Sequence, residues 1–408
     1  MASTEPHPIP TVTHPAATAG FVRDQATVLS YAALGCFTFW LYAFAPAVTL
    51  LRGELGFSYA VLGLYSVFWA GGSAIAGLAF TWLAANLSRG TQFWSSAALA
   101  VVGAALFALT SGVGATLAAA AIFGFAGTTL LAVIQGILSD RHGARRDKAL
   151  TEANIGGGLS SILAPLATGG LAATTIGWRF TFALPAVVFV VLYLVYRNRA
   201  FQSLPRRESS ARSGGLSLTC WMFIGLMAVG SAIEFCLVYF APQALIAIGM
   251  STAAASAALV SNFLGILVGR IAGASLTHRP GRAVPLLAIS LVVTTASFSL
   301  FWLSGQPVLA VLALFFCGVG VANLYPLALS LTLDASAGLE DKANARSQLA
   351  VGLVVAVAPF ALGSLADQAG LFTAFGIVPL LIVISALLLW AGLRRRRQDN
   401  FRNEPKGE

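Results

Sequence analysis

Residues 158–172 read GLSSILAPLATGGLA, and residues 352–366 read GLVVAVAPFALGSLA. When the two stretches are aligned without gaps and extended through Pro185 and Pro379, nine of 28 positions are identical. Apolar helices can share nine identities by chance, but three glycine or proline landmarks stay in register with a shared Ala-Pro pair. We therefore interpret the two stretches as copies, one in each half of a duplicated chain.

The composition places that duplicated chain in a membrane. Of its 408 residues 58% are hydrophobic and 10% are charged, and the mean hydropathy is +0.83. Soluble proteins are roughly 45–50% apolar and about 25% charged, so a soluble enzyme is excluded. A membrane β-barrel would need short alternating segments, whereas uninterrupted apolar runs such as 179–196 and 377–393 indicate helices. The sequence predicts an all-α polytopic membrane protein.

Apolar segments fall into two sets of six, and a basic stretch separates the sets. The prediction is twelve transmembrane helices arranged as two pseudo-symmetric six-helix bundles. The expected spans are 27–51, 58–84, 92–111, 114–138, 152–174, 178–197, 217–243, 252–276, 284–304, 307–333, 345–366 and 371–393.

Loop charges give an independent test of this topology. If the amino terminus is cytoplasmic, all but three of the 24 Lys and Arg residues fall on the cytoplasmic side. This bias is the positive-inside pattern and predicts that both termini are cytoplasmic. It also accounts for the net charge of +9, so we expect no nucleic-acid partner. The expected divisions are a disordered tail (1–25), a bundle (26–198), a basic linker (199–215), a second bundle (216–393) and a basic tail (394–408).

Residues 26–393 resemble the major facilitator superfamily of secondary transporters. The likeness lies in the six-plus-six pattern, the basic linker, the step Gly177-Trp178-Arg179-Phe180 and the loop from Asp140-Arg141 to Arg145-Arg146. The resemblance implies two bundles that rock around a central site for a small-molecule substrate. It further implies a multi-pass protein of a bacterial inner (plasma) membrane, in contact with the lipid bilayer, that is not an enzyme.

The family's loop motifs are only partly present. The loop between the second and third spans reads Asn86-Leu87-Ser88-Arg89-Gly90 and has no acidic residue, and the loop after the eighth span has His278 where the family places an acid. Candidate gating residues are Arg89, Asp140, Arg270, Arg279 and Asp334.

Family antiporters often carry Gly-Pro-x-x-Gly-Gly in the fifth span. This chain has Ala164-Pro165 followed by Gly169-Gly170, which is one residue longer, and part of the element recurs in the eleventh span. Because small residues allow helices to approach and proline bends them, we favour a structural role over an antiporter signature. The helix-bending candidates are Pro165, Gly169, Pro359 and Gly363.

Glu234 is the most informative charge, because it lies beyond the middle of the seventh span. An ionised carboxylate there is costly, so it is expected to face a cavity, find a partner or carry a proton. Arg270 lies about 10 Å from the predicted cytoplasmic end of its span, and a depth difference of about 10 Å argues against a salt bridge with Glu234. Snorkelling of Arg270 to the membrane surface is the simpler interpretation.

Further binding candidates lie on the helices that line the family's cavity. With Glu234, they are Trp40, Tyr42, Gln135, Tyr239, Asn323 and Tyr325. Each is also explained by ordinary interhelical packing. The chain has no phosphate-binding loop, no His-Glu-x-x-His pair and no histidine in the spans, so we expect neither nucleotide-driven transport nor a metal or other cofactor.

An aromatic cavity with one carboxylate suits an amphiphilic compound that is neutral or cationic. The leading hypothesis is proton-coupled efflux of such a compound by alternating access. Proton-coupled import of a small metabolite is the alternative. A non-transporting membrane sensor or lipid-handling protein is the rival from another class. The sequence leaves the oligomeric state open.

Overall fold

The computed structural model describes residues 22–197, 214–276, 282–336 and 338–403. Every regular element in these ranges is a helix. Most of the predicted tail (1–25) and linker (199–215) and the last part of the basic tail lie outside the described residues.

The first half of the chain forms six α-helices and one 3-10 turn. They are α1 (Gln25–Leu55), α2 (Tyr59–Asn86), α3 (Arg89–Leu109), α4 (Val113–His142), η1 (Gly143–Arg145), α5 (Arg146–Ala172) and α6 (Phe180–Tyr196).

The second half repeats this order with two interruptions. Its helices are α7 (Leu218–Ala247), α8 (Thr252–Leu276), α9 (Ala283–Leu303), α10 (Pro307–Val321), α11 (Leu324–Asp334), α12 (Glu340–Ala369), α13 (Leu371–Ala374) and α14 (Ile377–Asn403). The span that corresponds to α4 is therefore broken at Ala322 and Asn323 into α10 and α11.

Eleven helical stretches of the described chain are long and apolar enough to cross a membrane. In this count α10 with α11, and α13 with α14, each make one stretch. The twelfth predicted span is α6, an apolar helix of 17 residues, which is shorter than the others. The predicted segments therefore match the helices, with a short sixth member.

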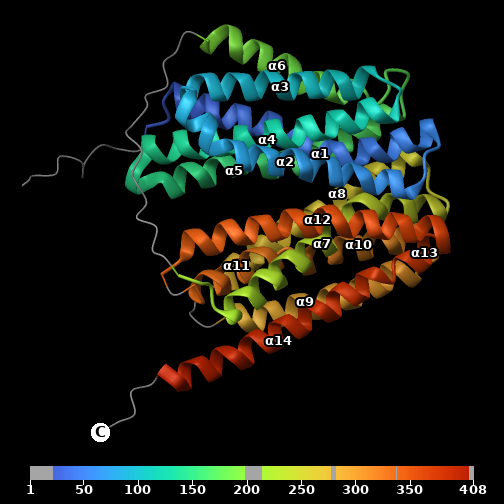
Figure 1. The fold of residues 1–408 in the computed structure, drawn as a ribbon. Coiled ribbons are helices and arrows are strands. Elements are labelled where there is room, and N and C mark those ends of the chain that lie inside the picture. Colours follow the sequence, from blue (N-terminus) through green and yellow to red (C-terminus); the bar gives the residue numbers. More distant parts are fainter. Residues whose placement is uncertain (1–21, 198–213, 277–281, 337, 404–408) are drawn as a thin grey trace, which may run out of the picture.

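Two bundles lie side by side in Figure 1, one made of α1–α6 and the other of α7–α14. At one end, called here the linker end, Gln25 begins α1, Tyr196 ends α6 and Leu218 begins α7. The opposite end, called the far end, holds the turns between α1 and α2 and between α7 and α8. Between the bundles, α2 packs against α12 and α5 packs against α8.

Local signals explain where several helices begin. Asp24 caps α1 by accepting from the Thr27 amide at 3.0 Å, and Ser217 caps α7 by accepting from the Cys220 amide at 3.1 Å. Each side chain satisfies an amide that has no partner inside the helix. Trp178, in the step that precedes α6, donates its indole N–H to Glu54 at the end of α1 over 2.6 Å.

Glycines set the closest helix crossing in each bundle. Gly72 of α2 and Gly124 of α4 face each other so closely that a Cβ on either would overlap the backbone oxygen of the other helix. Gly265 of α8 and Gly318 of α10 repeat the arrangement in the second bundle. Close approach of this kind requires residues without a side chain. The duplication read from α5 and α12 therefore extends to α2 with α8 and to α4 with α10.

Candidate substrate site between the bundles

At the far end, hydrogen bonds join the two bundles. Arg52 of α1 donates to the side-chain oxygen of Gln243 on α7 at 2.9 Å, and its guanidinium lies 3.8 Å from the centre of the Tyr59 ring. Asp367 of α12 accepts from the backbone amides of Tyr59 and Ala60 at 2.8 Å each. Because those amides open α2, the carboxylate also meets the positive end of the helix dipole.

The four predicted helix-bending residues lie close to these contacts. Pro165 lies inside α5 and Pro359 inside α12. Gly169 packs against the Ala253–Ala257 turn of α8, and Gly363 packs against the backbone oxygen of Tyr59. The glycines therefore bring the bundles together, so that the far end is closed by backbone packing as well as by hydrogen bonds.

Glu234 lies near the middle of α7, and its depth is set by neighbouring contacts. One turn before it, Gly230 is so close to Leu324 of α11 that a Cβ would lie 3.0 Å from the leucine Cβ. Glu234 is therefore about 6 Å nearer the far end than the break between α10 and α11.

Asn323 occupies that break and ties it to α8. It is 7% exposed, and its amide nitrogen donates to the backbone oxygen of Gly269 at 2.8 Å. One turn later, Gly273 leaves room for the Asn323 side chain, because a Cβ there would overlap its amide oxygen. The level of Gly269 and Gly273 on α8 is thereby fixed to the level of Asn323.

These two contacts correct the predicted depth of Arg270. Arg270 follows Gly269, so it lies within about one helical turn of Glu234 in depth rather than about 10 Å away. Arg270 lies within electrostatic range of Glu234 and of Tyr42 on α1. Among the described residues Glu234 and Arg270 do not form a direct ion pair. Counting residues from an assumed helix end could not reveal this, because the crossing of α8 with α10 sets the level.

Tyr42 is the residue of the first bundle that lies near Glu234 and Arg270. Its ring meets Phe263 of α8 edge-on, with centroids 5.0 Å apart. Tyr239 is buried on α7, five residues beyond Glu234, whereas Gln135 is exposed on α4, seven residues before the linker end of that helix. Tyr42, Glu234 and Arg270 therefore form one group, which three helices contribute, and Gln135 lies nearer the linker end.

Tyr325, just past the break in the tenth span, has a partner that the sequence did not single out. Gln348 of α12 donates its amide N–H to the Tyr325 hydroxyl at 2.8 Å. Arg52, Gln243 and Asp367 were also not identified from the sequence. All three lie near helix ends, where polar residues are common at the membrane surface. Their positions in the sequence therefore did not indicate that they contact the other bundle.

Trp40 lies inside the first bundle. Its side chain is fully buried, its indole N–H donates to the backbone oxygen of Phe182 at 3.0 Å, and its ring stacks on Phe189 at 5.4 Å. Phe123 joins the same cluster and stacks on Trp69 at 5.7 Å. Trp40 and Trp69 therefore belong to an aromatic core, called here the aromatic core of the first bundle and made of Trp40, Phe44, Trp69, Phe107, Phe123, Phe182 and Phe189.

The gating candidates form ion pairs inside each bundle at the linker end. Arg89, which begins α3, pairs with Asp140 near the end of α4. Asp334, which ends α11, lies 3.6 Å from Arg396 of α14. Arg279 lies outside the described residues.

A polar cluster at the linker end of the first bundle was not foreseen. Asp24 accepts from Thr27 and pairs with Arg141, and the Thr27 hydroxyl lies 2.9 Å from a His142 ring nitrogen. Arg23 makes two hydrogen bonds of 2.8 Å to Glu152. Burial raises the pKa of Asp24, but hydrogen bonds from Thr27 and the charge of Arg141 outweigh it and hold that pKa below its usual value.

The family profile described as Major Facilitator Superfamily matches residues 28–339. The chain belongs to this superfamily. The resemblance inferred from the sequence is thereby confirmed. By its fold the protein is a secondary transporter and a multi-pass membrane protein, and it is not an enzyme.

Individual relatives of this superfamily member are distant. The cyanate transport protein CynX of Escherichia coli (strain K12) is 28% identical over 309 residues, which cover 72% of this chain and 77% of CynX. A bacterial homologue of the human lysosomal transporter Spinster, in an inward-facing and occupied conformation, superimposes with a TM-score of 0.77 at 15% identity over 92% of this chain and 98% of that one. The nucleoside transporter NupG gives 0.68 at 16% identity, over 91% and 98% of the two chains. The structural matches show the fold alone.

Proposed function

We propose that this transporter imports a small anionic metabolite together with a proton across the cytoplasmic membrane, by alternating access. The observation that carries the proposal is the grouping of Glu234, Arg270 and Tyr42 within about one helical turn in depth, from helices of both bundles. Import of a small metabolite thus takes precedence over the efflux that the sequence alone favoured.

The chemistry follows from competition for one guanidinium. An arginine within a membrane span needs a partner or water, and Glu234 lies within electrostatic range of Arg270. When Glu234 carries a proton, Arg270 is available to an anionic substrate. When Glu234 ionises, the carboxylate competes with the anion for Arg270 and favours its release. Proton and anion therefore bind together and leave together.

Orientation and access fit this cycle. The positive-inside bias supports a cytoplasmic linker end. Arg52, Asp367 and the glycine contacts join the bundles at the far end, whereas Arg270 at the depth of the site and Gln135 nearer the linker end are exposed, which supports access from the linker end. An exposed polar side chain at that depth needs water rather than lipid. In this proposal the conformation corresponds to an inward-open state.

Similarity gives limited additional support. CynX is named as a cyanate transport protein, and cyanate is a small anion. At 28% identity we take from it only the class of substrate.

Efflux of an amphiphilic compound is the second candidate. The edge-on contact of Tyr42 with Phe263 supplies an aromatic surface beside the charges. Such a surface would suit an amphiphile, and a cationic one would pair with ionised Glu234.

Uptake into proteoliposomes tests both candidates. An inward proton gradient is expected to drive accumulation of labelled small monovalent anions, cyanate among them, in the wild type. Glu234→Gln is expected to lose gradient-driven accumulation but retain anion exchange, because glutamine mimics the protonated acid. Arg270→Gln is expected to lose both. The matched controls Glu340→Gln and Arg346→Gln change charges on α12 and are expected to behave as wild type.

Two outcomes would overturn the import proposal. One is gradient-driven anion accumulation that persists in Glu234→Gln. The other is proton flux evoked by cationic amphiphiles while every anion is silent, which would establish the efflux candidate.

A further inference from the structure

A groove runs along the outside of the first bundle, between α3 and α6. It has a volume of about 950 Å³ and is lined by residues of α3 and α6, by Ser88 just before α3 and by Arg197 just after α6. Figure 1 shows α6 as the outermost helix of this bundle, so the groove opens toward the surroundings of the protein and lies apart from the substrate site.

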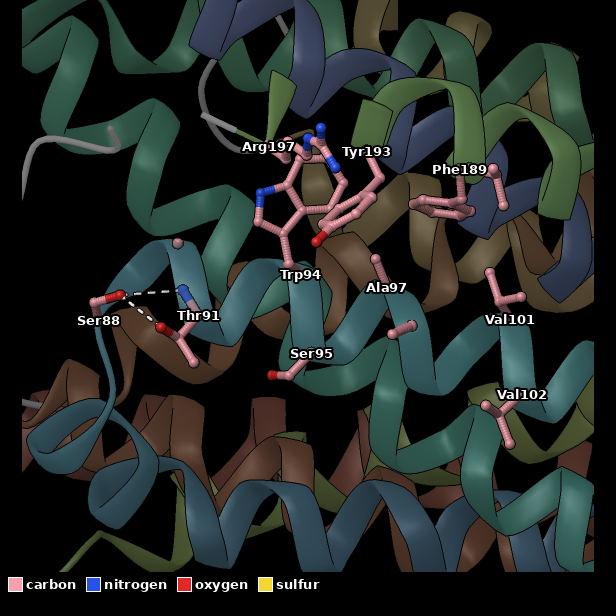
Figure 2. A pocket seen from close by; sticks show the side chains of 13 residues that line it. Ser88, Thr91, Trp94, Ser95, Ala97, Val101, Val102, Phe189, Tyr193 and Arg197 are labelled. Carbon is pink, nitrogen blue, oxygen red and sulfur yellow. Dashed lines mark hydrogen bonds between the residues drawn. The ribbon is translucent and has the colours of Figure 1, made fainter. Parts of the chain in front are cut away.

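The groove has a polar end and an apolar end. Trp94, Tyr193 and Arg197 gather at one end, with Ser88 and Thr91 on the same side, whereas Phe189, Val101 and Val102 lie toward the other (Figure 2). The polar end is at the linker end of the bundle, because Arg197 directly follows α6 and Ser88 precedes α3. This polarity is that of a lipid, whose headgroup and acyl chains need different surroundings.

Trp94 points to a missing hydrogen-bond acceptor. Its ring meets Tyr193 edge-on at 5.2 Å, which places it between the two helices. Its indole nitrogen is buried and has no hydrogen-bond partner in the described structure. A buried donor without an acceptor is costly, so a turn of the ring that brings this N–H to a ligand oxygen in the groove would be stabilising.

Positive charge lies at the same end of the groove. Arg197 is exposed and forms no ion pair with another described residue. The amino terminus of α3, a helix of 21 residues, lies at this end of the groove. Its cap, Ser88, accepts a hydrogen bond from the Thr91 amide at 3.1 Å. The end of this helix dipole favours an anion. Arg89, by contrast, is already paired with Asp140.

Because α6 is short, this site is expected to lie at the depth of the lipid headgroups. Its 17 residues rise about 25 Å, less than the roughly 30 Å of a hydrocarbon core. Tyr193 and Arg197 are therefore expected at or just below headgroup depth, where aromatic and cationic side chains anchor a span. On this outer face of a membrane protein, lipids are the expected neighbours.

We propose that this groove binds an anionic phospholipid of the leaflet at the linker end. The phosphate accepts from Trp94 and pairs with Arg197 near the start of α3, and an acyl chain lies along Val101, Val102 and Phe189. The bound lipid fills the space that the short α6 leaves beside α3.

Native mass spectrometry of the purified transporter tests the site. The probes are phosphatidylglycerol and phosphatidylcholine with identical acyl chains, and inorganic phosphate. The wild type is expected to retain phosphatidylglycerol in preference to phosphatidylcholine and to retain no phosphate. Arg197→Gln is expected to weaken phosphatidylglycerol retention about fivefold and Trp94→Phe about threefold, whereas Arg197→Lys keeps most of it.

The matched control is Arg394→Gln at the corresponding end of α14. Arg394 lies 5.3 Å from the Trp390 ring and is outside the groove, so its loss removes the same charge from the other bundle. Retention by this variant at the wild-type level supports the site. Equal losses in Arg197→Gln and Arg394→Gln, no preference for phosphatidylglycerol, or retention of phosphate alone would overturn it. Each variant is first shown to be monodisperse, so that misfolding is not read as lost binding.

Discussion

The two bundles share a scaffold but differ in what fills it. Both cross their helices at paired glycines, Gly72 with Gly124 in the first and Gly265 with Gly318 in the second. The first bundle then packs its interior with stacked aromatic rings around a continuous α4. The second bundle breaks the equivalent span at Asn323 and places Glu234 and Arg270 near the break. The two copies therefore share their packing geometry, whereas the charged residues Glu234 and Arg270 inside the membrane spans lie in the second bundle.

The largest expected effect is on stability, and it tests whether Trp40 belongs to the aromatic core of the first bundle or to the substrate site. Trp40→Ala is expected to destabilise the protein by about 3–5 kcal/mol, because it removes a fully buried ring and its hydrogen bond to Phe182. Trp40→Phe keeps much of the ring packing and is expected to retain transport. The check is thermal unfolding together with uptake per folded molecule. A folded Trp40→Phe protein that has lost uptake would assign Trp40 to the site instead.

The next prediction tests whether the glycine crossing is required. Gly72→Val is expected to cost about 3 kcal/mol, because the new side chain meets the Ala121 backbone, which cannot rotate away. Gly71→Val is the matched control, since a Cβ at Gly71 meets nothing within 4 Å. Gly318→Val is expected to match Gly72→Val, because the second bundle repeats the crossing. The yield of monodisperse protein and its unfolding temperature report the difference, and equal behaviour of Gly71→Val and Gly72→Val would contradict it.

The sequence predicted what depends on hydropathy and on repetition. Span positions, two bundles and the copy of α5 in α12 follow from the apolar pattern and from the Ala-Pro register. The sequence could not predict which way a mid-span ring points, so Trp40 was placed with the cavity residues although it packs in a bundle. It also could not predict helix levels, because the contacts of Gly230 and Asn323 that align Glu234 with Arg270 join segments distant in sequence.

A smaller effect is expected where the bundles meet. Asp367→Asn weakens two charge-assisted hydrogen bonds to the start of α2 and is expected to shift the equilibrium toward an open far end by about tenfold. Ser66 donates to the Ala356 backbone oxygen at 3.3 Å across this contact and is buried, so Ser66→Cys in a background without the four native cysteines reports opening.

Alkylation of that cysteine by a membrane-impermeant maleimide is expected to accelerate about tenfold in Asp367→Asn, the same factor as the shift in population. Glu54→Gln is the control, because Glu54 is an acid at the same end that contacts Trp178 and Arg179 of its own bundle. Acceleration by Glu54→Gln as large as that by Asp367→Asn would mean that either change merely loosens the far end.

The smallest effect concerns the caps that begin the first helix of each bundle. Asp24→Ala and Ser217→Ala are each expected to cost about 1 kcal/mol at neutral pH, since both remove a side-chain acceptor. Only the aspartate titrates.

The pKa of Asp24 is lower in the folded protein than the unfolded value of 3.8, so its contribution to stability is present above that value and is lost as the pH falls through the folded pKa. Because Asp24 is partly exposed, solvent screens its pairing with Arg141 and keeps the effect small. Unfolding measured from pH 7 down to pH 3 is therefore expected to show a shrinking deficit for Asp24→Ala below about pH 4 and a constant one for Ser217→Ala. A deficit of Asp24→Ala that stays constant to pH 3 would mean that the charge does not contribute, and that the two caps are equivalent despite their different chemistry.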